Sequence, residues 1–98
     1  MLYIKSIATK LIDNSSYPAI VLLNFCDING IKHEFIEKWP IISDEEFTNM
    51  FPIDCAIGCT LLKEEDNSYI VSTSSPWGIE SEDGLTTFEI DKNLLIKE

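Results

Sequence analysis

The chain has 98 residues, and its 17 acidic side chains against seven lysines give a formal net charge of −10. This length suits one domain spanning residues 1–98, and a hydrophobic content of 45% is too high for a disordered chain. The acidic balance and the lack of arginine disfavour nucleic acid and anionic membranes as partners, because both are polyanions.

The first part of the chain predicts three strands. Residues 2–12 fit a strand or a helix, and their β-branched side chains and the missing N-cap residue favour a strand. Residues 17–28 are apolar on both faces, which is typical of a central strand. Asn29-Gly30 between apolar runs predicts a type I′ hairpin turn, after which residues 31–39 return as the partner strand.

A short helix is predicted after this hairpin. Ser43 followed by Glu46 has the spacing of a capping box, in which the serine caps the first turn and the glutamate reaches back. We expect the helix at about residues 44–50, ending before Pro52.

Short strands and turns alternate through the rest of the chain. Apolar side chains occupy every second position over residues 53–61, which predicts a half-buried strand. Gly58 in this strand marks a bulge or a close approach of another part of the chain. Further strands are expected at residues 69–73, 85–90 and 94–96. The pattern predicts a mainly β (α+β) fold, a small antiparallel barrel or strongly twisted sheet of six to seven short strands with one short helix.

The residues that most often carry chemistry are few. The chain has an odd number of cysteines, namely Cys26, Cys55 and Cys59. We expect these three thiols to be reduced and mostly buried. A zinc site needs about four ligands, and the chain offers one Cys-x3-Cys and one histidine, so we expect no metal and no cofactor. His33, placed opposite Cys26 by the predicted hairpin, suggests a thiol enzyme as a minor alternative. With no orienting third group and no phosphate-binding glycine loop, we expect the protein not to be an enzyme.

The acidic side chains are the candidate binding residues. They form three clusters: Asp44, Glu45 and Glu46; Glu64, Glu65 and Asp66; and Glu80, Glu82 and Asp83. Two clusters on one face would make a negative patch that steers a cationic protein. Trp77, just before the third cluster, suits a binding hot spot if it is exposed, whereas the alternative is a core residue that closes a barrel. Trp39 is expected in the core.

In length, negative charge and lack of a catalytic motif or an export signal, the chain resembles the small acidic bacterial immunity proteins that neutralise a cognate toxin domain. The resemblance is one of type. It implies a cytoplasmic inhibitor whose partner is a basic, often nuclease-type, toxin domain, with the acidic clusters and Trp77 masking that domain's nucleic-acid contact. The start of the chain has no signal-peptide pattern, and no apolar run approaches the roughly 20 residues that span a bilayer. The alternative function is a homodimeric or assembly-forming module, for which residues 94–96 offer an edge strand.

Overall fold

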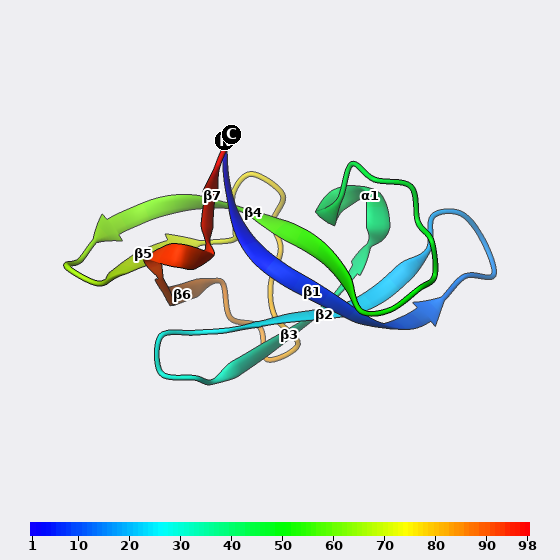
Figure 1. The fold of residues 1–98 in the computed structure, drawn as a ribbon, viewed down its shortest axis with the longest axis horizontal. Helices are drawn as coiled ribbons and strands as arrows, with labels where there is room; N and C mark the ends of the chain where they lie inside the picture. The colour runs from blue at the N-terminus through cyan, green and yellow to red at the C-terminus, as the bar shows by residue number, and fades with distance from the viewer.

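A computed structural model describes residues 1–98, and its main feature is a strongly curled antiparallel sheet of seven strands (Figure 1). The strands are β1 (Leu2–Asp13), β2 (Ile20–Cys26), β3 (Lys32–Lys38), β4 (Ile53–Glu64), β5 (Ser68–Ser72), β6 (Thr87–Asp91) and β7 (Leu95–Lys97). The helical elements are α1 (Trp39–Ile42) and the short 3₁₀ helix η1 (Lys92–Leu94). The predicted mainly β fold with one short helix is therefore confirmed. No helix has the length and apolar character needed to cross a membrane.

The two longest strands, β1 and β4, form the centre of the sheet, whose order is β3-β2-β1-β4-β5-β6. They pair along Leu2–Ala8 of β1. The other edge of β1 is shared, because β7 pairs with Leu2–Ile4 and β2 pairs from Ile7 onward. This arrangement brings the two chain ends together, where the Glu98 amide donates to the Met1 carbonyl (Figure 1).

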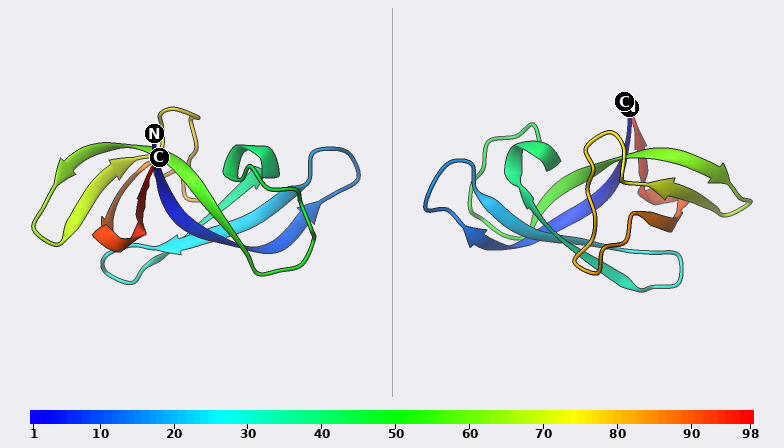
Figure 2. Two further views of the ribbon diagram at one scale, coloured as in Figure 1. Left: turned by 45° about the horizontal axis from the view of Figure 1, so that its top comes forward. Right: turned by 180° about the vertical axis from the view of Figure 1, so that it is seen from behind.

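The curl brings the outer strands β3 and β6 towards each other. The Ile28 amide in the β2–β3 turn donates to the Glu89 carbonyl of β6 at 2.8 Å. The Glu82 amide donates to the Glu34 carbonyl of β3, also at 2.8 Å. Figure 2 shows the segment before β6, coloured yellow to orange, passing over the open side of the sheet. The buried core inside the curl includes a cluster of aromatic rings: Phe25, Phe35 and Phe88.

The β2–β3 hairpin forms at the predicted place, but its turn is not of type I′. That turn needs a positive φ at two residues, and only Gly30 has one, at 79°. The Gly30 amide donates to the Asp27 carbonyl and the Asp27 amide donates to the Ile31 carbonyl, both at 2.9 Å. The loop is therefore one residue longer than a two-residue turn.

The longer loop changes which residues face each other across the hairpin. Cys26 lies opposite Lys32, and His33 lies opposite Phe25. The predicted pairing of Cys26 with His33 is therefore wrong by one residue.

The helix lies earlier than predicted. Helix α1 is a single turn with a proline in its first positions, where the missing amide hydrogen costs nothing, and it buries Trp39 and Ile42. Ser43 follows it in an extended conformation and does not cap a helix over residues 44–50. The expected capping box is thus wrong, and Asn49, with a φ of 58°, adopts a left-handed conformation instead.

Candidate protein-binding surface

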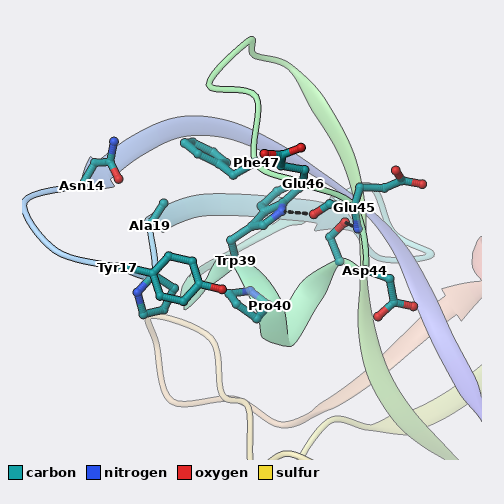
Figure 3. Close-up of a pocket in the computed structure, with 11 residues that line it drawn as sticks. Asn14, Tyr17, Ala19, Trp39, Pro40, Asp44, Glu45, Glu46 and Phe47 are labelled. Carbon is teal, nitrogen blue, oxygen red and sulfur yellow. Dashed lines mark hydrogen bonds between the residues drawn. The ribbon is translucent and has the colours of Figure 1, made fainter.

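The loop that follows α1 carries the first acidic cluster and is held against a buried indole. Trp39 is 4% exposed, and its Nε1 donates to the Glu45 carbonyl oxygen at 2.7 Å (Figure 3). Ser43 Oγ accepts a hydrogen bond from the Glu45 amide at 3.0 Å. With the backbone turned inward in this way, the side chains of Asp44, Glu45 and Glu46 are exposed. We call residues 44–46 the acidic loop.

A groove of about 540 Å³ lies on one side of the acidic loop. Trp39 and Phe47 line it, with their rings 5.4 Å apart, and the segment after β1 supplies Asn14 and Tyr17 (Figure 3). Tyr17 is 90% exposed, the most of any large hydrophobic side chain in the chain. We call this hollow the Tyr17 groove.

A second groove, of about 460 Å³, lies on the other side of the acidic loop and contains Trp77. The indole is 55% exposed, so Trp77 is a surface residue. One edge of its ring lies over Gly58, where an added Cβ would stand 2.8 Å from Trp77 Cδ1. Gly58 therefore marks the close approach that the sequence predicted. We call this hollow the Trp77 groove.

The two grooves have an unbalanced negative charge. Their acidic lining residues are Asp44, Glu45, Glu46, Asp54 and Glu98, and no lysine lines either groove. Glu98 lies next to the N-terminal ammonium, which donates to its main-chain oxygen. The other acids lining the grooves form none of the ion pairs in the structure.

The second acidic cluster differs because lysines balance it. Glu64 pairs with Lys92 at 2.8 Å, and Glu65 pairs with Lys63 at 3.0 Å. The hydrogen bond and the charge of Lys92 lower the pKa of Glu64. These residues, with Asp66, lie at the tip of the β4–β5 hairpin, toward the end of the molecule away from α1 (Figure 1).

The third acidic cluster lies apart from Trp77, although the two are close in sequence. Glu82 is bonded to β3 through its amide, whereas Trp77 rests on Gly58 of β4. The Trp77 groove contains none of Glu80, Glu82 and Asp83. The structure thus places Trp77 beside the acidic loop and leaves the other two clusters elsewhere.

Sequence reasoning missed the Tyr17 groove, whose only local signal is an aromatic residue directly after the polar turn at residues 13–16.

Asp27 is an orienting partner for His33 that sequence reasoning did not find. Its Oδ2 lies 2.7 Å from His33 Nε2, and its Oδ1 accepts the amides of Asn29 and Ile31 at 2.8 and 3.1 Å. Partial burial acts to raise the pKa of Asp27, but the hydrogen bonds from His33, Ile31 and Asn29 outweigh it and lower that pKa. The His33 ring also packs 4.8 Å from the Phe88 ring, so the pair stabilises the hairpin against β6.

All three cysteines are free thiols, but they differ in exposure. Cys59 is buried and Cys55 is half-buried, and burial raises the pKa of Cys55 to about 12 and that of Cys59 to about 11. Cys26 is exposed, which corrects the expectation of mostly buried thiols for this residue. The reason is strand alternation, since Phe25 takes the inward position at the end of β2.

The structure has no group of three or more His, Cys, Asp or Glu side chains that could hold a metal ion. No protein-family model, no curated protein and no solved structure matches this chain. The two grooves and the acidic loop between them form the candidate binding surface.

Proposed function

We propose that this protein is an inhibitor that binds a cationic protein domain, as an immunity protein binds a basic, nuclease-type toxin domain. The docking surface is the acidic loop with the Trp77 groove. One observation carries the proposal: the grooves flanking the acidic loop are lined by five acidic residues and no lysine, beside an exposed tryptophan. Such a surface is complementary in charge to a basic partner.

Each part of this surface has a separate physical role in binding. An aromatic anchor that becomes buried typically contributes about 2 kcal/mol or more and mainly slows dissociation. The acidic loop attracts the partner over a longer range and raises the association rate by roughly 10- to 1000-fold at low salt. The hydrogen bond from Trp39 Nε1 to Glu45 fixes the loop beforehand, so little conformational entropy is lost on binding.

The test compares two charge reversals of equal size. One variant reverses Asp44, Glu45 and Glu46 to lysine, and its matched control reverses Glu64, Glu65 and Asp66 to lysine. The partner assayed is the product of the gene directly upstream, by surface plasmon resonance and by growth of cells that express it. We expect the first reversal to lower the association rate at least about 10-fold and to flatten its salt dependence, and the control to change it by less than about 2-fold.

A second variant separates the anchor from the charges. Trp77→Ala should raise the dissociation rate while the association rate and the melting temperature stay close to wild type, because the ring is more than half exposed. If the upstream product does not bind, or if both charge reversals act equally, the proposal is wrong. The alternative, an assembly module, predicts instead a dimer or larger species of the isolated protein by light scattering.

A further inference from the structure

We infer that the partner occupies both grooves at once, through a basic segment that crosses the acidic loop and places one cationic side chain against Trp77 and another against Tyr17. This inference rests on the proposed function, because it assumes a cationic protein partner. It adds the Tyr17 groove as a second binding site and defines the partner segment by its chemistry.

The geometry makes the two grooves parts of one surface. Pro40, Ser43, Asp44 and Glu45 line both of them, so α1 and the acidic loop that follows it separate the two hollows. A segment that contacts the outer side of this loop therefore passes both grooves. The carboxylates of Asp44 and Glu45 serve both sides, since each residue belongs to both linings.

Packing within the chain covers only part of the aromatic rings at the two grooves, since Trp77 rests one edge on Gly58 and remains 55% exposed. Other aromatic side chains of this region, such as Trp39 and Phe47, pack against the core, whereas Tyr17 is 90% exposed. The faces of tyrosine and tryptophan attract ammonium and guanidinium groups. An exposed ring in a groove that carboxylates also line is thus suited to a lysine or arginine side chain.

An aromatic ring and a carboxylate together bind a cation elsewhere in this protein. Lys92 Nζ lies 5.1 Å from the centre of the Tyr69 ring and 2.8 Å from a carboxylate oxygen of Glu64. An aromatic face and a carboxylate there hold one lysine of the chain. The Tyr17 and Trp77 grooves have the ring and the carboxylates, and no lysine of the chain lines them. The cation at these two grooves is therefore expected to come from the partner.

The probe for this inference is a hexa-arginine peptide, titrated into the ¹⁵N-labelled full chain at low salt. We expect the Trp77 indole signal, the amides of residues 44–46 and the Tyr17 amide to shift together with one dissociation constant. Acetyl-arginine amide, which carries one cationic side chain, should bind far more weakly because it cannot fill both grooves.

Single substitutions test whether the Tyr17 groove takes part in binding. Tyr17→Ala should weaken hexa-arginine binding about 3-fold or more and leave the melting temperature unchanged, because the side chain is exposed. The matched control is Leu62→Ala, which truncates an exposed side chain of β4, and it should alter binding by less than about 2-fold.

The outcomes separate the two proposals. If the peptide shifts only the Trp77 groove and Tyr17→Ala binds as wild type does, the two-groove inference is overturned and the proposed function stands. If the peptide shifts neither groove, or shifts the amides of residues 64–66 equally, both proposals are overturned.

Discussion

Gly58 fixes the position of Trp77 at the scale of single residues. Its φ is not in the left-handed region, so the backbone itself accepts alanine, but the new Cβ would stand 2.8 Å from Trp77 Cδ1 and 2.9 Å from Nε1. Because the ring is largely exposed, we expect Gly58→Ala to displace it at a cost of about 1 kcal/mol rather than to unfold the protein. The Trp77 indole NMR signal should move while that of Trp39 stays in place. An unmoved Trp77 signal would contradict the close approach.

The three thiols provide a second prediction at this scale. Cys26 is exposed, whereas burial raises the pKa values of Cys55 and Cys59. Since the thiolate is the reactive form, one thiol per chain should react rapidly with a disulfide reagent at neutral pH and the other two only slowly. Cys26→Ser should remove the fast phase. Three fast thiols in the native protein, or a fast phase that survives this substitution, would show that the assignment of exposure is wrong.

At the scale of elements, the β2–β3 hairpin depends on the carboxylate of Asp27. A carboxyl group whose pKa is lowered by folding stabilises the folded state above its unfolded pKa, and this contribution is lost as the pH falls through the folded pKa. The hydrogen bonds from His33, Ile31 and Asn29 lower the pKa of Asp27 despite the opposing effect of burial. We therefore expect Asp27→Asn to destabilise the protein by about 1–3 kcal/mol at pH 7.

The same prediction has a pH signature. The difference in the free energy of unfolding between wild type and Asp27→Asn should shrink as the pH falls from about 5 to below about 3, because the wild-type carboxyl then becomes neutral. Urea denaturation across this range measures it. A difference that stays constant with pH would show that the charge of Asp27 does not stabilise the turn.

The strands could be predicted from the sequence because alternation is a local property of the chain. The register of the hairpin could not, because it depends on a loop that is one residue longer than the Asn29-Gly30 pattern suggests. The side chain of Asp27 helps to select that loop by accepting the amides of Asn29 and Ile31. A local propensity for one turn type was thus overridden by a side-chain hydrogen bond.

The position of the helix and part of the candidate site also could not be predicted from local sequence patterns. The capping-box spacing is present in the sequence, but in the fold the buried Trp39 indole bonds to the Glu45 carbonyl, which a helix over residues 44–50 would use itself. The acidic residues of the loop were identifiable from sequence. The Tyr17 groove was not, because it joins the segment after β1 to the segment after α1, and only the tertiary structure brings them together.

At the scale of the whole molecule, charge is distributed unevenly along a shape of 43 × 25 × 22 Å. The tip of the β4–β5 hairpin carries acids that are paired with Lys63 and Lys92. The grooves beside the acidic loop have no lysine in their lining. We therefore expect the negative potential to be strongest at the α1 end, which would orient a cationic partner before contact.

Salt should act in opposite directions on folding and on binding. With 17 acids against seven lysines, repulsion between like charges outweighs the few ion pairs, so screening should stabilise the folded chain. Raising sodium chloride from about 0.01 to 0.3 M shortens the screening length from about 30 Å to below 10 Å, and the melting temperature should rise by a few degrees.

Over the same range, the association rate with a cationic partner should fall, because the attraction between opposite charges is screened. Calorimetry and stopped-flow mixing on the same samples measure the two effects. The reversal of Asp44, Glu45 and Glu46 to lysine reduces the net charge from −10. It should therefore weaken the salt dependence of both quantities, whereas the control reversal at residues 64–66 should weaken only that of stability. If the control reversal at residues 64–66 also weakens the salt dependence of the association rate, the attraction comes from the total charge of the molecule rather than from the acidic loop.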